Sequence, residues 1–295
     1  RLAAFRTGRL HYGWAHYGGL GTDAALALKR THPDFKLTPV PVGYVNMLLL
    51  PLDKKPFDDI RVRRAIHLAI DRQEMVKTIV GPQGGHVSGP ISWRLFPDWA
   101  LSEQELLQTP GYRQPKDQDL AEARKLLAEA GYPQGLTVDA EGAQYVQWLN
   151  LYPVEVAKSQ LAKVGITVNL KIQDWAKYKD AEEVKGDFLL RARGHNAYPE
   201  PDDQLFTRHY SKGSRNYQKF KDAQLDAWLD AQRAELDPAK RKELVRKIQL
   251  RLLEVLPQIW LFTADQMAIV HPDVRNLATD VVTTHGITDE IWMAR

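Results

Sequence analysis

The stretch that decides the fold reads Pro56-Phe57-Asp58-Asp59-Ile60-Arg61-Val62-Arg63-Arg64-Ala65-Ile66-His67-Leu68-Ala69-Ile70-Asp71-Arg72. Pro56 ends any extended segment before it, and Asp58 or Asp59 can accept hydrogen bonds from the first free amides of a helix. Apolar residues then recur at the three-and-four spacing of a buried helix face: Val62, Ala65, Ile66, Ala69 and Ile70. The pattern predicts a helix that runs to about Val80 and packs on a core.

Composition excludes several classes of protein. Hydrophobic residues make up 44% and charged residues 26% of the 295 residues, as in an ordinary globular protein. The 40 basic and 37 acidic side chains give a net charge of +3, which is too even for a nucleic-acid surface. No apolar run approaches the ~18 residues of a membrane span. Without cysteine, the chain has no disulfide, no thiolate chemistry and no cysteine metal site.

Helical and strand patterns alternate along the chain. Helices are predicted at 22–30, 117–130, 145–164 with an interruption near Pro153, 175–184, 222–235 and 238–256. Strands are predicted at 35–42, 43–50, 136–140, 166–172, 188–191 and 258–263, and the prolines at 39 and 41 place the first of these at a sheet edge. The Gly- and Pro-rich segment 81–115 is predicted to be a long loop. Strands separated by such helices predict an α/β fold with a largely parallel sheet flanked by helices.

Further blocks of sequence carry a family resemblance. They are DLAEARKLLAEAGY at 119–132, QLAKVGITV at 160–168, YPEPD at 198–202 and LPQIWLF at 256–262. With the opening stretch, they resemble in order and spacing the extracytoplasmic solute-binding proteins of ABC importers, in the oligopeptide/dipeptide/nickel-binding family, also called family 5. The resemblance covers about Leu37 to the C-terminus.

The resemblance implies a type II periplasmic-binding-protein-like lobe, and members of the family are longer chains with another lobe before the point where this chain starts. Residues 46–267 are then a nearly complete C-terminal lobe, while 1–45 and 268–295 belong to the N-terminal lobe. Two strands that cross between the lobes, near 46–50 and 260–263, would form the hinge. The start at Arg1 to Gly8 resembles the inside of a helix and its glycine stop, which predicts a fragment. The alternative is a self-sufficient protein with a cleft of its own.

Ligand contacts are expected at strand ends that face the cleft. The resemblance implies that, in peptide-binding relatives, an aspartate in the run before Pro201 pairs with the ligand's amino group. The corresponding position here is Ala197, whose side chain cannot neutralise an ammonium group. Arg191, Arg193 and His195 make the loop cationic, which suits a carboxylate or phosphate. The alternative places the arginines on a solvated face; it is favoured for Arg191 and stays open for Arg193.

Aromatic side chains give a second set of candidates, because rings supply large, stiff contact surfaces. Trp93 lies where the family has a cleft-lining loop, and Tyr145 and Trp148 open a helix that should point at the cleft; packing in the core is the alternative for a lone tryptophan. Trp175 and Trp228 are predicted to pack in the core or on the surface, and Asp202 and Asp203 to form a turn and a helix cap. The candidate ligand-binding residues are Trp93, Tyr145, Trp148, Arg193, His195, Asn196 and Tyr198.

These observations favour the solute-binding component of an ABC importer. It would be a periplasmic or membrane-anchored extracytoplasmic monomer that presents a small organic solute to the membrane permease. An anionic solute is favoured over an ordinary peptide, and a peptide or a metal chelate stays open as the lesser variant. No catalytic residue, metal site, cofactor or nucleic-acid partner is expected. Two alternatives from other classes stay open. One is an α/β enzyme with a cleft, for which the sequence offers no nucleophile–base or metal-ligand spacing. The other is a ligand-less interaction module whose cleft is filled by its own long side chains.

Overall fold

The computed structural model describes residues 2–15, 22–81, 84–183, 185–196, 200–276 and 292–294. The helices are α1 Leu2–Arg6, α2 Thr22–Thr31, α3 Ile60–Ala69, α4 Arg72–Ile79, α5 Glu103–Gln108, α6 Asp117–Glu129, α7 Gln147–Asn150, α8 Tyr152–Ala162, α9 Trp175–Glu183, α10 Pro201–His209, α11 Ala223–Ala234 and α12 Pro238–Val255. The strands are β1 Tyr12–Ala15, β2 Lys36–Leu49, β3 Gly85–Val87, β4 Leu136–Ala143, β5 Ile166–Gln173, β6 Leu190–Asn196, β7 Gln258–Val270, β8 Val274–Arg275 and β9 Trp292–Met293.

The central sheet has the strand order β1-β7-β2-β6-β4-β5, and β3 pairs with β7. Only the pairs β4–β5 and β4–β6 are parallel among the described strands, and the other pairs in this sheet are antiparallel. The α/β fold is confirmed, but the prediction of a largely parallel sheet is wrong: the sheet is mixed. The reason is the path of the chain. Helices α7, α8 and α9 provide the crossovers that parallel neighbours need, whereas β7 returns along β2 in the opposite direction.

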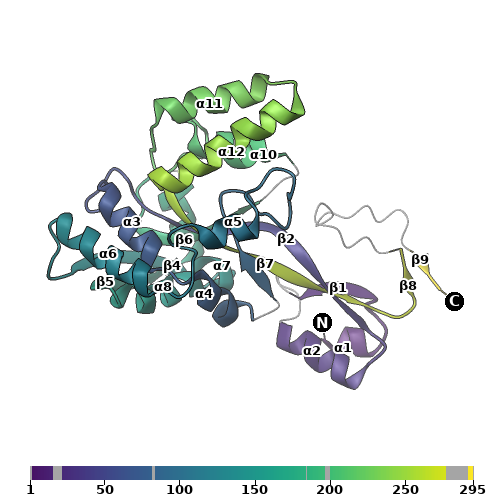
Figure 1. Cartoon of the computed structure of the whole chain (residues 1–295). Coiled ribbons are helices and arrows are strands. Elements are labelled where there is room, and N and C mark those ends of the chain that lie inside the picture. The colour runs from purple at the N-terminus through teal and green to yellow at the C-terminus, as the bar shows by residue number, and fades with distance from the viewer. Residues whose placement is uncertain are drawn as a thin grey trace.

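Strands β2 and β7 form one long antiparallel ribbon. Its register runs from Lys36 opposite Val270 to Leu49 opposite Gln258, with irregularities around Val45. The two strands predicted at 35–42 and 43–50 are therefore one. Figure 1 shows this ribbon leading from the large part of the molecule to a smaller part that carries α1, α2 and β1. Because β6 pairs with β2 only from residue 44 onward, the prolines at 39 and 41 lie where one side of β2 has no partner strand among the described residues.

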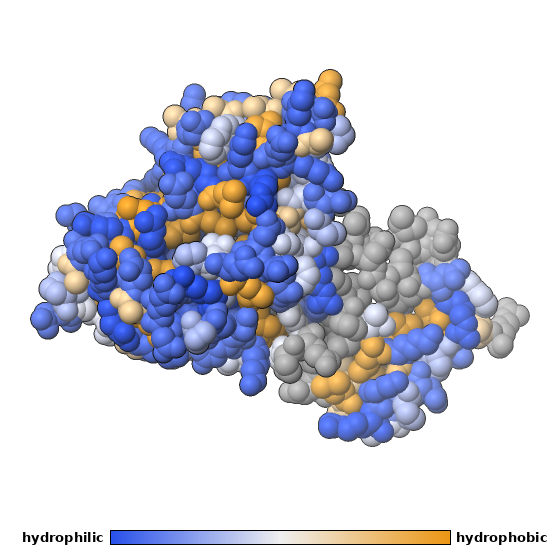
Figure 2. All heavy atoms as spheres, viewed as in Figure 1, coloured by the Kyte–Doolittle hydropathy of each residue, from blue (hydrophilic) through white to orange (hydrophobic). Residues whose placement is uncertain are grey.

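Side chains at the end of β2, and of Leu50 directly after it, alternate between two hydrophobic cores. Leu48 and Leu50 enter a core with α3, α6 and α8, while Met47 and Leu49 enter a second core with α11 and α12. All four side chains are buried, and each contributes about 1.5–3 kcal/mol by leaving water. The ribbon is thus held from both faces. In Figure 2 the face in view is mainly hydrophilic, and apolar atoms gather in the hollow between the α11–α12 part and the part that carries α3 and α6.

The opening stretch forms two helices instead of the single predicted one. Asp59 caps α3 by accepting from the Arg61 amide at 2.8 Å, and Asp71 caps α4 by accepting from the Glu74 amide at 3.0 Å. Ile70, between the helices, has extended backbone angles (φ −73°, ψ 119°). A capping aspartate inside an apolar-periodic run therefore marks a new helix start.

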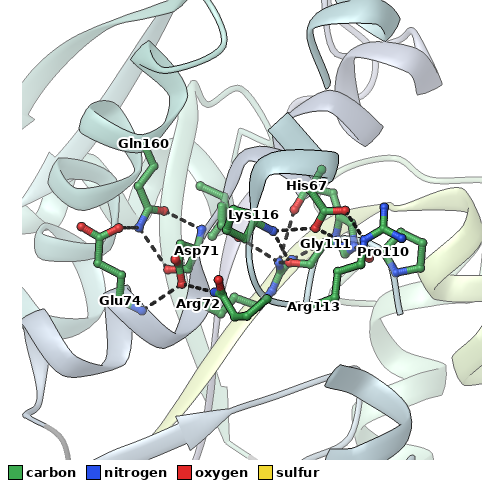
Figure 3. Close-up of polar contacts among 12 residues, drawn as sticks. His67, Asp71, Arg72, Glu74, Pro110, Gly111, Arg113, Lys116 and Gln160 are labelled. Carbon is green, nitrogen blue, oxygen red and sulfur yellow. Dashed lines mark hydrogen bonds and ion pairs between the residues drawn. The ribbon is translucent and has the colours of Figure 1, made fainter. Parts of the chain in front are cut away.

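Arg72 follows this cap and is buried. Its Nε donates to the carbonyl of Trp260 at 2.8 Å, Nη1 donates to the carbonyl of Gly111 at 2.5 Å, and Nη2 lies 3.0 Å from Nδ1 of His67. Figure 3 shows this network, together with the exchange of hydrogen bonds between Gln160 and the backbone of Asp71. Burial lowers the pKa of Arg72 and, with Arg72 beside it, that of His67. The hydrogen bonds of His67, Asp71, Arg72 and Gln160 thus hold α3, α4 and α8 against strand β7.

The segment 81–115, predicted as a loop, contains β3 and α5. It packs across α12, where the side-chain amide of Gln249 donates to the Trp99 carbonyl at 2.8 Å and accepts from the Leu101 amide at 3.2 Å. The predicted helix at 145–164 is likewise divided, into α7 and α8, by Leu151, whose backbone is not helical (φ −130°, ψ −62°). The remaining predicted helices and strands are confirmed to within a few residues, although β6 and β7 continue beyond the predicted ends.

Candidate functional site

A pocket of about 410 Å³ opens at the carboxyl ends of the parallel strands. Strands β4, β5 and β6 run in the same direction, so the residues that follow them meet at one edge of the sheet. The lining comes from the β4–α7 connection and α7, from α9, from the end of β6, from Tyr44 of β2 and from α10 with the turn after it. The pocket therefore borders the β2–β7 ribbon.

Aromatic rings form one wall of the pocket. The rings of Tyr145 and Trp175 lie 4.6 Å apart between centroids, and Trp175 stacks on Tyr178 at 5.9 Å. Tyr145 is 55% exposed, so its ring is free to contact a solute. Trp175, which the sequence predicted to be core or surface packing, lines the pocket because it is the first residue of α9, directly beyond the end of β5.

A buried ionic network lies beside the pocket. Arg191 and Glu141 face each other as register partners on β6 and β4, and the Nε atom of Arg191 lies 3.0 Å from Oε1 of Glu141. Arg191 Nη1 also lies 3.2 Å from Oε2 of Glu182 on α9, and its guanidinium sits 4.0 Å above the Tyr178 ring. Arg191 is fully buried, so the prediction that it lies on a solvated face is wrong. Helix α9 covers that face of the sheet.

Arg193 lines the pocket, but carboxylates already pair with it. Its Nη2 lies 2.5 Å from Oε1 of Glu183, its Nε lies 3.5 Å from Oε1 of Glu182, and its guanidinium sits 5.5 Å from the Trp175 ring centre. The cationic character expected for the 191–195 segment is therefore largely balanced by α9.

Two further arginines line the pocket and were not among the sequence candidates. Arg208 is in the last turn of α10, and Arg215 lies in the turn that follows. Burial, and then the nearby positive charge of Arg215, lower the pKa of Arg208 to about 9. Tyr217 joins them, and burial with Glu183 and Glu182 raises its pKa. The sequence signal was weak, since an arginine late in a helix usually pairs with the helix dipole.

The other sequence candidates fall in different places. Trp148 is 8% exposed and belongs to the core with α3 and α8. The Nε1 of Trp93 donates to the carbonyl of Val87 at 3.0 Å, and neither tryptophan lines the pocket. His195 and Asn196 continue β6 opposite β2, but their side chains lie outside the described part of the structure. Tyr198 lies outside the described residues, as does Ala197. Of the aromatic and cationic candidates, the structure brings Tyr145 and Arg193 together.

A serine, a histidine and an aspartate meet near β3. Ser92 Oγ lies 2.9 Å from Nε2 of His86, and Nδ1 of His86 lies 3.9 Å from Oδ1 of Asp265. The arrangement does not fit a nucleophilic site. Ser92 is fully buried, the histidine–aspartate distance exceeds a hydrogen bond, and Arg94 Nη1 holds the other aspartate oxygen at 2.6 Å. Burial, and then Arg94, lower the pKa of His86 to about 3.

The described residues include no group of three or more His, Cys, Asp and Glu side chains that could hold a metal ion. No helix within the described ranges has the length and apolar character needed to cross a bilayer.

Comparison with known proteins places this geometry in a family. Residues 1–217 match the bacterial extracellular solute-binding proteins, family 5 middle region. Heme-binding protein A of Haemophilus influenzae is 25% identical over 243 residues, which are 80% of this chain and 42% of that protein. The dipeptide-binding protein of Escherichia coli is 25% identical over 272 residues, 89% of this chain and 48% of that protein.

A solved structure has the same fold. The ABC transporter-associated periplasmic binding protein DppA from Helicobacter pylori, in complex with the peptide STSA, superposes with a TM-score of 0.80 at 20% identity; the match covers 100% of this chain and 55% of that one. The chain thus spans about half the length of the relatives it matches. With the family match over residues 1–217 and the type II binding-protein fold, the chain belongs to family 5 of the bacterial extracellular solute-binding proteins.

Proposed function

We propose that this chain is part of the solute-binding component of an ABC importer and that the pocket at the carboxyl ends of β4, β5 and β6 captures a small organic solute. The pocket itself is the observation that carries the proposal. It is an open space of about 410 Å³ with an aromatic wall and polar groups, the combination typical of small-molecule sites. A ligand-less interaction module would fill such a space with its own side chains, and an enzyme would bring a reactive group into it.

The domain arrangement follows from the β2–β7 ribbon. Residues 46–267 act as one lobe, and 1–45 with 268–295 belong to the other. The ribbon, which joins the two parts in Figure 1, acts as the hinge. Closing the second lobe over the pocket excludes water and strengthens the polar contacts inside. The closed form is then the one that the membrane permease recognises.

The names of the relatives support an organic solute as the ligand and a location of the protein outside the cytoplasm. The names of the two relatives refer to heme and dipeptide binding, and the solved structure is a periplasmic protein with a bound peptide. The solute of this chain is accordingly an organic molecule with polar ends, met outside the cytoplasm by a monomeric binding protein. The candidates that contact it are Tyr145 and Arg193, which line the pocket. His195 and Asn196, at the end of β6, and Tyr198, outside the described residues, stay candidates from the sequence, as do Trp93 and Trp148, which do not line the pocket.

An uptake experiment tests the proposal. Cells that lack the gene for this protein are grown beside cells in which it is restored, and solute depletion from the medium is compared by mass spectrometry. We expect one class of organic solute to remain in the medium without the gene. Restoration with Tyr145→Ala should leave uptake at least fivefold slower, because the exposed wall of the pocket is lost.

Tyr152→Ala is the matched control, since Tyr152 is a comparably exposed tyrosine (37%) that does not line the pocket. This control should restore uptake fully. Identical depletion of every solute with and without the gene would refute a role in transport.

A further inference from the structure

Arg208 and Arg215 stand out among the cations of the pocket, because no carboxylate side chain of the described residues pairs with them. No carboxylate oxygen of the described residues lies within 4.0 Å of a guanidinium nitrogen of either residue. The Nε of Arg208 is removed from solvent and has no hydrogen-bond acceptor among the described residues. A buried donor without a partner is costly, and more so when it is charged, so such groups usually await a ligand or water.

Of the nearby carboxylates, Glu182 and Glu183 have other partners, whereas Oδ2 of Asp203 is buried without a hydrogen-bond partner among the described residues. Glu182 accepts from Arg191 and lies near Arg193, and Glu183 pairs with Arg193 at 2.5 Å and with Lys179 at 3.5 Å. Asp203, one turn earlier on α10, acts on Arg208 only through its charge, as does Glu182. Two like-charged guanidiniums therefore face one pocket without a counter-ion at contact distance.

The turn that carries Arg215 has a defined geometry. The Arg215 amide donates to the carbonyl of Thr207 at 2.9 Å. The Asn216 side chain accepts from the Phe220 amide at 2.9 Å and donates to the Phe220 carbonyl at 2.7 Å, which closes the loop on itself. The backbone that carries Arg215 is thus held against the end of α10, which carries Arg208, so little backbone ordering is needed when a ligand binds.

We propose that Arg208 and Arg215 together form an oxyanion subsite, which binds a carboxylate or phosphate group of the solute while the aromatic wall of Tyr145 and Trp175 holds its body. Guanidinium groups match these oxyanions because their planar donors can form paired hydrogen bonds. A bound oxyanion also offsets the repulsion that lowers the pKa of Arg208. The inference rests on the proposed solute-binding function and names the chemical class of the solute.

Nuclear magnetic resonance of the whole 295-residue chain tests this subsite. The Nε–H signals of Arg208 and Arg215 are assigned by their absence from R208Q and R215Q. The protein is titrated with succinate and, separately, with inorganic phosphate, with succinamide as the neutral analogue and sodium chloride as the ionic-strength control. We expect both signals to shift together and saturably with at least one oxyanion, and not with succinamide. The oxyanion that binds more tightly, succinate or phosphate, shows whether the subsite prefers a carboxylate or a phosphate group of the solute.

Variants give the second arm. Binding of the preferred oxyanion, followed by signals of other pocket residues, should weaken at least tenfold in R208Q and in R215Q. It should be unchanged in R246Q, since Arg246 on α12 pairs with Glu105 at 2.6 Å outside the pocket. R208K and R215K keep the charge and should retain weaker, saturable binding, which separates a local effect from misfolding.

Shifts that merely follow ionic strength, or glutamine variants that bind the oxyanion as well as the parent, would overturn the subsite. These results are independent of the uptake experiment. Gene-dependent uptake without oxyanion binding would leave transport standing and remove the oxyanion subsite alone.

Discussion

The Nε atom of Arg191 lies 3.0 Å from Oε1 of Glu141, and both side chains are buried between the sheet and α9. Because the two residues are register partners on parallel neighbouring strands, the pair ties the strands together beside the pocket. Neither residue lines the pocket, so the role of the pair is to hold β4, β6 and α9 in place rather than to contact the solute.

Removing one member of this pair should destabilise the protein strongly. Glu141→Ala leaves the Arg191 charge buried with only Glu182 as a carboxylate partner, and we expect a loss of about 3–5 kcal/mol in the free energy of unfolding. Urea denaturation followed by circular dichroism measures this loss. Asp139→Asn is the matched control on the same strand, because Asp139 pairs with Lys171 at the surface (2.8 Å) and its loss should change stability little.

The double variant Glu141→Leu/Arg191→Met tests whether the cost comes from the unpaired charge. Since apolar residues of similar volume often replace a buried ion pair without loss, the double variant should be more stable than Glu141→Ala. A double variant that is less stable than the single one would show that the other contacts of Arg191, with the Glu182 carboxylate and the Tyr178 carbonyl, matter more than the pairing with Glu141.

Arg72→Met should destabilise the fold without altering the pocket. The substitution removes the donors to the carbonyls of Trp260 and Gly111, and the expected loss is on the order of 3 kcal/mol. Arg64→Met is the control, since Arg64 is an exposed arginine on α3 that donates to the Glu254 carbonyl at 3.2 Å. The melting temperatures of the two variants, measured by thermal unfolding, are compared: that of Arg72→Met should be the lower. Equal melting temperatures would contradict the structural role assigned to Arg72.

Acid should destabilise the protein through its buried histidines. Burial lowers the pKa of His86 and of His209 to about 3, well below 6.5. The unfolded chain therefore binds protons that the folded chain does not, and stability present above pH 6.5 is lost as the pH falls toward 3. Each histidine contributes up to about 1.4 kcal/mol per pH unit in this window. Unfolding free energies of His209→Gln, measured between pH 7 and pH 4, should show a shallower slope; an unchanged slope would exclude His209 as a contributor.

Arg193→Ala should weaken binding of an anionic solute more than that of a neutral one. The substitution deletes a positive charge that lies beside Glu182 and Glu183, which makes the pocket more negative. Titrations with succinate and succinamide, followed by the nuclear magnetic resonance signals of other pocket residues, compare the two ligands. Equal losses for both would show that Arg193 acts only by supporting the structure.

Much of the fold could be predicted because its signals are local. Capping aspartates such as Asp59 and Asp237 and helix stops such as Gly131 and Gly165 mark the ends of elements, and the apolar periodicity marks their buried faces. The strand directions could not be derived in this way. Whether β7 runs with or against β2 depends on where the chain crosses between two parts of the molecule, which no local pattern records.

The candidate site was predicted only in part. Arg193 was found because it lies near a strand end, and Tyr145 because an aromatic residue opens the helix predicted to point at the cleft. Arg191, two residues from Arg193 on the same strand and therefore on the same face, is buried beneath α9. The difference in burial between Arg191 and Arg193 depends on how far α9 covers this face of the sheet, and the sequence pattern of the strand does not record that. Arg208 and Arg215 were missed because what sets them apart is that no carboxylate of the described residues lies within ion-pair distance of them, and only the three-dimensional arrangement shows this.

Native mass spectrometry tests the central claim most directly: the protein is purified from its source without denaturation and compared with Trp175→Ala. If the pocket binds a solute, the parent protein should carry a small organic molecule that is absent from Trp175→Ala, and its mass identifies the ligand. A parent protein without any bound molecule, or the same molecule retained by Trp175→Ala, would contradict the assignment of this pocket as the solute site.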